Sequence, residues 1–286
     1  MARSNGIDRV QMQNALKRLA TNIQFSSVDD PVRSLTITSS ISNEGKTTIS
    51  CGLAEAFASA GKRVLIVECD LRRRSVANQL KVYAKHGLYS VLSHQVPLDE
   101  AVVPTSVTGL SFLDAEPRLP NPVDLLQSRR FHALMEDLER AYDYVIYDTP
   151  PISAFVDGAV VGHLTDATLL VVRDNFTKRE TVLSSVEQLK TAEANLIGTV
   201  LNFCEVEENE YYYSYYAKDG KRMRREDVEA ARVQTAAPAS APGVRPVPEG
   251  TVTAPRPSEA QRRISPQSTA EMLGLTHDPR IRAGEE

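Results

Sequence analysis

The stretch "SLTITSSISNEGKTT", residues 34–48, decides the fold of this chain. Within residues 34–39, the four central residues 35–38 are β-branched or apolar in the manner of a buried strand, and residues 46–60 have the apolar spacing of a helix. A turn rich in Ser and Asn joins them and ends in Gly45-Lys46-Thr47. A strand, a loop of small residues and a helix, in this order, form the context that a phosphate-binding loop requires.

The residue types of the loop fit the binding of a nucleoside triphosphate. Backbone N–H groups can point inward, and the helix N-terminus adds positive potential. Lys46 would reach the β- and γ-phosphates, and the Thr47 hydroxyl would ligate Mg²⁺. Asn43 stands where a glycine would be easiest, and Asn tolerates positive φ. The expected nucleotide contacts are Ser42, Asn43, Glu44, Gly45, Lys46, Thr47 and Thr48. The plain alternative is a chance Gly-Lys-Thr after a polar turn.

Outward from this loop, short apolar segments alternate with helical patterns. Several of these segments are apolar almost throughout, as strands covered on both faces must be. The alternation predicts an α/β fold of the P-loop NTPase type, a mostly parallel sheet with helices on both faces. The expected strands are 34–39, 63–68, 110–115, 142–148, 167–173 and 196–202, and the expected helices are 8–25, 46–60, 123–140, 154–163 and 178–192.

Two of the expected strands end in carboxylates. "VLIVECD" places Glu68 and Asp70 two residues apart, so both can face one side of an extended segment, and "YDYVIYD" ends in Asp148. Because the carboxyl ends of parallel strands share one edge, we expect these acids to meet at the phosphate loop. Few carboxylates, with water and phosphate oxygens, suffice for Mg²⁺. A single acid at a strand end would be read simply as a solvated edge.

The overall composition narrows the class of protein. The chain has 286 residues, 42% hydrophobic and 24% charged, and a net charge of −4 gives no reason to expect nucleic-acid binding. Cys51, Cys69 and Cys204 lack metal-like spacing. No apolar run is long enough to span a membrane, and the N-terminus lacks a signal-peptide core. A cytoplasmic protein is expected.

The C-terminal part has a different composition. Five of the ten tyrosines lie within 211–216, after the acidic run "EVEENE" at 205–210. Beyond them, 217–286 contains no aromatic residue and holds eight of the sixteen prolines, which predicts a disordered tail rich in Pro and Ala. The predicted organisation is an N-terminal helix region (1–30), a P-loop domain (31–204), the acidic and tyrosine segment (205–216) and the tail (217–286).

With these motifs in view, the chain resembles the bacterial tyrosine kinases of the capsular-polysaccharide type. "SISNEGKTT", "VLIVECDLRRR" and "YDYVIYDTPP" look like that family's Walker A, A′ and B motifs, and the family keeps a tyrosine cluster after its last strand. The resemblance covers about residues 12–216. It implies metal-associated roles for Asp70 and Asp148, an adenine contact for Asn202, and the family's Arg at Arg72.

The chain also departs from the family pattern. Glu68 stands where the family has the Asp that is the usual candidate for accepting the tyrosine proton; Glu can still act as a base, with altered reach. Ser42-Asn43 replaces the usual Pro-Gly of the phosphate loop. The N-terminal charged pattern linked to ring assembly falls on Asn14, Lys17 and Ala20, so a family-like ring is in question.

The resemblance implies Mg·ATP-dependent phosphorylation of the chain's own tyrosine cluster on a neighbouring subunit, with Lys46, Glu68 and Asp70 catalytic and Thr47, Asp70 and Asp148 at the metal. The implied role is control of capsule or exopolysaccharide synthesis and export. The implied partners are a transmembrane activator of polysaccharide co-polymerase type, which would recruit the chain to the inner face of the membrane, and a cognate tyrosine phosphatase. The expected phosphate acceptors are Tyr211, Tyr212, Tyr213, Tyr215 and Tyr216.

Two other functions fit parts of the sequence. An ATPase of the partitioning or septum-positioning type would share the phosphate loop, but such enzymes often carry an extra lysine within positions 40–44, where this chain has none. They also have no reason to carry the tyrosine cluster. A degenerate nucleotide switch would explain the changes at Glu68 and Ser42-Asn43, but not the presence of Lys46 and Thr47 together with both aspartates.

Overall fold

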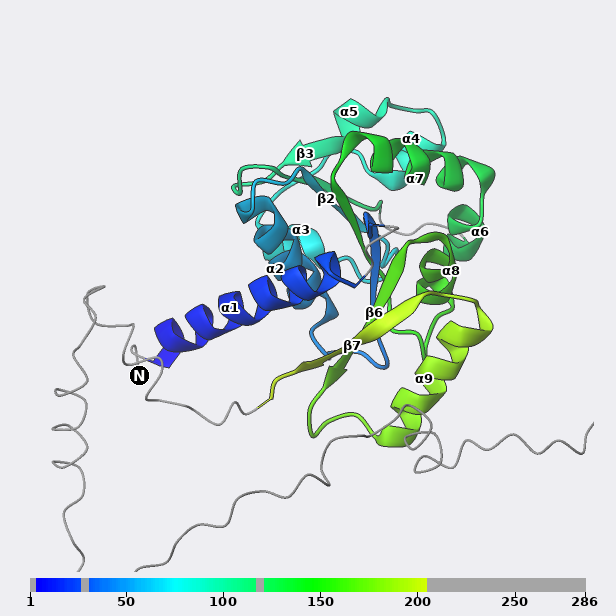
Figure 1. Cartoon of the computed structure of the whole chain (residues 1–286). Coiled ribbons are helices and arrows are strands. Elements are labelled where there is room, and N and C mark those ends of the chain that lie inside the picture. The colour runs from blue at the N-terminus through cyan, green and yellow to red at the C-terminus, as the bar shows by residue number, and fades with distance from the viewer. Residues whose placement is uncertain (1–3, 27–30, 117–120, 205–286) are drawn as a thin grey trace, which may run out of the picture. The chain divides into compact units, whose positions relative to one another are not determined.

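A computed structural model describes residues 4–26, 31–116 and 121–204 (Figure 1). The acidic and tyrosine segment at 205–216 and the tail at 217–286 lie outside these residues. Among the helices that are described, none combines the length and the apolar character needed to cross a membrane.

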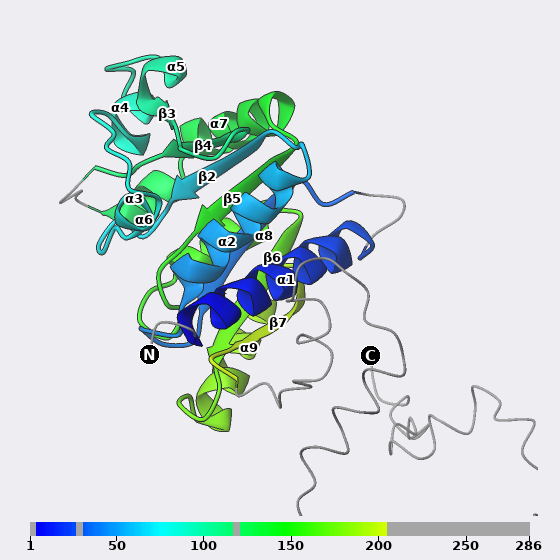
Figure 2. The same ribbon diagram turned by 90° about the vertical axis from the view of Figure 1, so that its left-hand side faces the viewer.

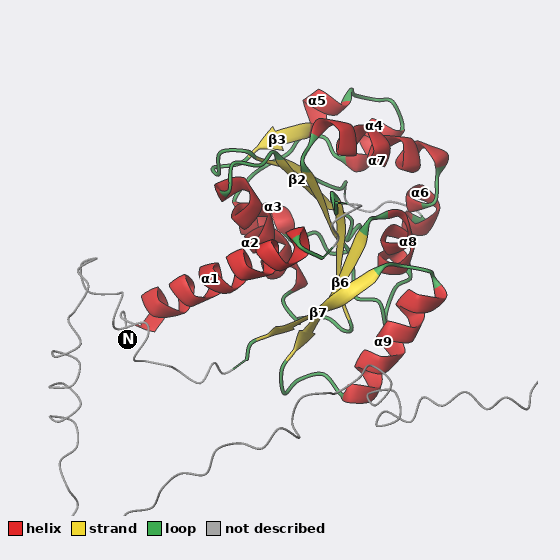
Figure 3. Cartoon of the chain, viewed as in Figure 1, coloured by secondary structure: helices red, strands yellow, loops and turns green. Residues whose placement is uncertain are grey.

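The core is a seven-stranded sheet in the order β3-β4-β2-β5-β1-β6-β7 (Figure 3). All neighbouring strands run parallel except β3, which is antiparallel to β4 at one edge. The predicted mostly parallel sheet is therefore confirmed. The strands are β1 (Ser34–Ser39), β2 (Val64–Glu68), β3 (Val102–Pro104), β4 (Leu110–Leu113), β5 (Tyr144–Asp148), β6 (Ala167–Arg173) and β7 (Leu196–Asn202).

Helices cover both faces of the sheet (Figures 1 and 2). One apolar cluster joins α1 and α2 to the sheet, another joins α4 and α7 to its other face, and a third involves α8 and α9. The helices are α1 (Ser4–Gln24), α2 (Lys46–Ser59), α3 (Val76–Leu80), α4 (Leu88–Leu92), α5 (Leu98–Ala101), α6 (Pro122–Leu126), α7 (Arg129–Ala141), α8 (Asp157–Leu164) and α9 (Arg179–Thr191).

Strand β2 shows why the central strands are apolar throughout. Ile66 packs into the cluster that contains Phe57 of α2, whereas Leu65 packs into the cluster that contains Leu138 of α7. Because successive side chains of a strand point to opposite faces, each face needs its own apolar set. All five residues of β2 are buried. This double burial fixes the strand and holds the carboxylates at its end in place.

Helix α1 packs on α2 through a narrow apolar stripe. Leu16, Ala20 and Ile23 are buried and recur at helical spacing. The helices approach closely at Gly52, where a Cβ atom would lie only 2.4 Å from Cδ1 of Leu16. The predicted N-terminal helix is thus present, and it begins four residues before the predicted start, at Ser4.

Several boundaries differ from the sequence prediction. The helix predicted over 123–140 is two helices, α6 and α7, because the Ser128 hydroxyl accepts a hydrogen bond from Phe131 N and caps a new helix. The helix predicted to begin at 154 begins at Asp157. Strand β3 and the short helices α3, α4 and α5 were not predicted, since segments of three to five residues carry too little periodicity to be recognised.

Candidate active site

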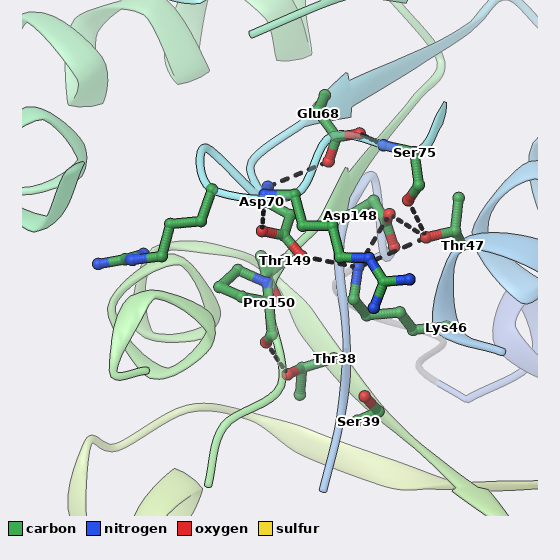
Figure 4. Close-up of polar contacts among 12 residues, drawn as sticks. Thr38, Ser39, Lys46, Thr47, Glu68, Asp70, Ser75, Asp148, Thr149 and Pro150 are labelled. Carbon is green, nitrogen blue, oxygen red and sulfur yellow. Dashed lines mark hydrogen bonds and ion pairs between the residues drawn. The ribbon is translucent and has the colours of Figure 1, made fainter. Parts of the chain in front are cut away.

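The candidate site lies at the carboxyl ends of the central strands (Figure 4). The start of α2 contributes Lys46 and Thr47, the end of β2 and the residues just after it contribute Glu68 and Asp70, and the end of β5 contributes Asp148. Glu68 and Asp148 are register partners on adjacent parallel strands. This edge of an open parallel sheet is where such folds bind ligands, so the predicted convergence of the loop and the three acids is present.

The phosphate loop turns sharply before helix α2. Asn43 has a φ of 68° and Gly45 a φ of 89°, so both occupy the left-handed region. Asn43 therefore takes the conformation for which its residue type was singled out. Helix α2 begins at Lys46, directing its first N–H groups toward the site. Ser42, Asn43 and Thr48 are exposed at the rim of the loop.

The side chain of Glu44 braces this loop from inside the protein. Glu44 is fully buried, and its Oε2 accepts a hydrogen bond from Ile41 N at 2.7 Å. Its Oε1 accepts bonds from Arg173 N and from the Thr177 hydroxyl. Glu44 thus ties the loop to the end of β6 and to the segment that follows it. The sequence indicated only a backbone contact to phosphate here.

The ammonium group of Lys46 lies between two buried carboxylates. Its Nζ is 3.3 Å from Oδ2 of Asp70 and 3.4 Å from Oδ2 of Asp148. Burial alone would lower the pKa of Lys46, but Asp148, Asp70 and Glu68 together outweigh it, and the pKa is raised. Burial raises the pKa of Asp148, against the opposing effect of Lys46. The lysine is therefore held as a cation at the point where phosphate oxygens would bind.

A short chain of hydroxyl groups surrounds Asp148. Thr47 Oγ1 donates a hydrogen bond to Asp148 Oδ2 at 2.7 Å, and Ser50 Oγ donates to Asp148 Oδ1 at 2.8 Å. Thr47 Oγ1 is also 2.7 Å from the hydroxyl of Ser75. The carboxylate of β5 is therefore fixed in orientation by the first two turns of α2.

Glu68 is surrounded by backbone donors. Its carboxylate accepts hydrogen bonds from the N–H groups of Asp70, Ser75 and Val76, at 3.1, 2.7 and 3.0 Å. Burial raises the pKa of Glu68 to about 8, with the charge of Asp148 adding to the effect. The side chain therefore holds the segment between β2 and α3 in its compact conformation, while its proton affinity is well above that of an ordinary carboxylate.

Two further residues singled out in the sequence lie on either side of this centre. Arg72 pairs with the buried Asp157 of α8 and stacks over the ring of Phe155 at 4.1 Å, linking the loop after β2 to the loop after β5. Asn202, at the end of β7, donates from Nδ2 to the carbonyl of Glu44 at 2.9 Å. Its side chain is packed against Gly45, so Asn202 supports the phosphate loop directly.

The sequence reading missed Ser50, Ser75, Asp157 and the bracing role of Glu44. Ser50 follows Lys46 by four residues on α2, so the helical repeat could have placed it on the same face as Lys46. No local signal marks Ser75, Asp157 or the Glu44 side chain, because their partners are distant in sequence.

The donor set suits a magnesium nucleotide. Carboxylate and hydroxyl oxygens of Thr47, Asp70 and Asp148 are the ligand types that Mg²⁺ prefers, with phosphate oxygens and water completing the shell. Within the described residues, no group of three His, Cys, Asp or Glu side chains could hold a metal ion alone.

Comparisons with known proteins agree with this geometry. Residues 35–175 match the family model described as "AAA domain". The chain is 36% identical over 203 residues to the tyrosine-protein kinase YwqD of Bacillus subtilis, covering 71% of this chain and 86% of that one. It is 34% identical over 208 residues to the tyrosine-protein kinase CpsD of Streptococcus agalactiae, covering 72% and 89%.

Solved structures give the same result. The kinase domain of the Escherichia coli tyrosine kinase ETK superposes with a TM-score of 0.63 at 30% identity, covering 69% of this chain and 79% of that one. The septum site-determining protein MinD of Pyrococcus horikoshii, complexed with Mg-ADP, has a TM-score of 0.52 at 21% identity over 69% and 76%, which shows a shared fold alone. The phosphate loop, the converging carboxylates and these similarities together establish that the chain belongs to the bacterial tyrosine-protein kinases, as the sequence motifs predicted.

Proposed function

We propose that this tyrosine kinase transfers the γ-phosphoryl group of Mg·ATP to the tyrosines at 211–216 of a neighbouring copy. The observation that carries the proposal is the position of Lys46 Nζ, 3.3 Å from Asp70 and 3.4 Å from Asp148 at the start of α2. A buried cation flanked by carboxylates on a phosphate loop suits the binding and charge neutralisation on which phosphoryl transfer depends.

Each residue of the site would have a separate role in phosphoryl transfer. The N–H groups of the phosphate loop and the Lys46 ammonium would hold the β- and γ-phosphates. A tyrosine oxygen would form the new bond to the γ-phosphorus as the bond to the β-phosphate oxygen breaks, which leaves ADP. The phenolic proton would pass to Glu68, whose pKa of about 8 lies between those of ordinary carboxylates and phenols. Asp70, whose Oδ2 is 3.3 Å from Lys46 Nζ, would lie near the transferred group.

The metal would be held by Thr47, Asp70 and Asp148. When bound, Mg²⁺ supplies positive charge that offsets the charge of the phosphate oxygens. The bonds from Thr47 and Ser50 to Asp148 orient the carboxylate before any ion arrives. The ammonium of Lys46 would shift from these carboxylates toward the phosphates, since their charge replaces that of the acids.

The adenine would lie beside Asn202. This side chain reaches the phosphate loop through its bond to the Glu44 carbonyl, and Phe203 next to it is exposed. An amide beside an exposed aromatic ring offers both hydrogen bonding and a stacking surface to a base. Asn202 would therefore form hydrogen bonds with the adenine base.

The biological role that fits this kinase is control of capsule or exopolysaccharide synthesis and export. A transmembrane activator of the polysaccharide co-polymerase type would hold the chain at the inner face of the membrane, and a cognate tyrosine phosphatase would reverse the modification. A solved neighbour titled "the chimerical protein CapA2B2", at 31% identity and a TM-score of 0.64, supports the idea of a protein partner.

One experiment tests the central claim. The chain is incubated with Mg·ATP, with and without the cytoplasmic segment of a candidate activator, and phosphate is mapped by mass spectrometry. We expect phosphate on residues within 211–216 in the wild type and none in Lys46→Met. ATP turnover with all five tyrosines of the cluster unmodified, even with the activator segment present, would instead support a hydrolase that uses water as the acceptor.

A further inference from the structure

A cavity beside the candidate active site is lined by basic side chains. Its volume is about 640 Å³, and it is formed by the loop after β2, helix α3, the segment 82–87 and the end of β4. Four cationic side chains and a histidine line it: Arg72, Arg73, Arg74, Lys85 and His86. None of these five side chains takes part in the proposed binding of the nucleotide and the metal.

The carboxylates of the cavity do not neutralise all of these cations. Asp114 pairs with Arg74 at 3.1 Å. Glu116 accepts hydrogen bonds from the N–H groups of Gly87, Tyr89 and Ser90. Within residues 4–26, 31–116 and 121–204, Arg73 and Lys85 form no ion pair, and both are exposed. The cavity therefore presents two cations without a carboxylate partner, against one carboxylate, Glu116, that is held by backbone N–H groups.

The cavity shares a wall with the catalytic carboxylates. Arg73 follows Asp70 by three residues, and its backbone N–H donates to Asp70 Oδ1 at 2.9 Å. Ser75, which ends the same loop, contacts both Glu68 and Thr47. A peptide bound in the cavity would thus lead directly into the site where a phenol meets the γ-phosphate.

We propose that this cavity binds the acidic run 205–210 of a second copy of the chain and so guides its tyrosines into the active site. The run holds four carboxylates, Glu205, Glu207, Glu208 and Glu210, and Tyr211 follows immediately. Opposite charge on a peptide and on a partly enclosed cavity favours their association and fixes the direction of binding. The inference rests on the proposed transfer to the tyrosine cluster and adds the feature by which that substrate is recognised.

The order of the strands favours binding between copies over binding within one copy. The described chain leaves the sheet after β7, whereas the cavity lies beside β2 and β4, four and five strands away. With adjacent strands about 4.8 Å apart, the distance is about 19–24 Å. Six extended residues span about 20 Å. A run reaching the cavity from its own β7 would be fully stretched, and its tyrosines would then have to turn back over the sheet.

Binding can be measured without catalysis. The probe is a fluorescently labelled peptide of residues 205–217, added to the full-length chain without nucleotide, beside a peptide with Gln at all four Glu positions. We expect the acidic peptide to bind about tenfold more tightly, and salt to weaken it. Lys85→Glu and Arg73→Glu should each reduce binding severalfold. Lys62→Glu, which makes the same charge change at an exposed site outside the cavity, should not. Equal binding of the two peptides overturns the inference.

A kinetic measurement separates this inference from the proposed function. The wild-type chain phosphorylates a full-length Lys46→Met copy, which serves only as substrate. Replacing the four Glu of the substrate copy by Lys should raise its KM about tenfold, with little change in kcat. The enzyme variant with Arg73→Glu and Lys85→Glu should restore the KM of that substrate.

Phosphorylation of 211–216 that is insensitive to both changes overturns the inference and leaves the proposed function intact. Absence of phosphate on the unaltered substrate copy overturns the proposed function, while the peptide result still reports on the cavity.

Discussion

The Nζ atom of Lys46 lies 3.3 Å from Oδ2 of Asp70 and 3.4 Å from Oδ2 of the fully buried Asp148. One positive charge thus compensates two buried carboxylates. Removing one partner of a buried ion pair leaves the other charged and uncompensated, which costs about 3–5 kcal/mol. Lys46, the proposed phosphate ligand, is therefore also required for the stability of the folded protein.

Lys46→Met should consequently destabilise the protein in a pH-dependent way. Without the lysine, burial raises the pKa of Asp148 further above its ordinary value, so the folded state binds more protons than the unfolded state. Stability then falls as the pH rises above the ordinary carboxylate range. We expect the loss in unfolding free energy to be small near pH 5 and to reach about 3 kcal/mol near pH 8. Urea unfolding at both pH values measures it. The exposed Lys62→Met is the control, and a loss independent of pH would contradict the prediction.

The rate of phosphorylation should depend on the protonation of Glu68. Since burial raises the pKa of Glu68 to about 8 and only the anion can accept a proton, the rate should increase with pH up to about 8 and then level off. Glu68→Gln should lower kcat by about 10²–10⁴-fold and abolish this rise. Glu68→Asp keeps a carboxylate and should retain the rise with a reduced rate. Stopped assays of phosphotyrosine from pH 6 to pH 9 test this. An unchanged profile in Glu68→Gln would exclude the residue as the base.

The brace formed by Glu44 should control nucleotide affinity. Glu44→Ala leaves the half-buried Ile41 N, Arg173 N and Thr177 hydroxyl without their acceptor. We expect a loss of about 2–4 kcal/mol in stability and a KM for ATP raised about tenfold or more. Thr177→Val removes only one of the three donors and should have a much smaller effect. Thermal unfolding and nucleotide titration measure the two effects. Equal KM values for wild type and Glu44→Ala would show that the brace is dispensable.

Asn43 offers a test of the backbone of the phosphate loop. Its φ of 68° is unfavourable for residues with a Cβ atom other than Asn, Asp and His. Asn43→Ala should cost about 1 kcal/mol in stability and weaken ATP binding, whereas Asn43→Gly should bind ATP at least as well as the wild type. Because Asn43 is exposed, no lost packing confuses the comparison. Weaker binding in the Gly variant than in the Ala variant would mean that the amide side chain itself contacts the nucleotide.

The sequence was informative where a local pattern has one structural meaning. The alternation of apolar segments with helical patterns was enough to predict the parallel sheet. The Gly45-Lys46-Thr47 turn and the acids at two strand ends then predicted that Lys46 and Asp148 meet across about a hundred residues of chain. The sequence did not predict contacts between residues that lie in separate loops and belong to no common repeating pattern. The pairing of Arg72 with Asp157 and the acceptor role of Glu44 depend on how separate loops pack, and no periodicity encodes that.

The strand order has a consequence for assembly. The acidic run follows β7 in the sequence, and β7 is an edge strand, whereas the basic cavity lies beside β2 and β4; in the proposed docking, each copy would therefore offer two different surfaces to its neighbours. Such a contact is heterologous: it closes into a ring only if the rotation from copy to copy divides a full turn, and otherwise extends as an open row. In an open row, the last copy always keeps one unmodified cluster and the first one vacant cavity. Each row would then keep one unphosphorylated tyrosine cluster when the reaction is complete. The unphosphorylated fraction of all clusters would therefore give the mean number of copies in a row.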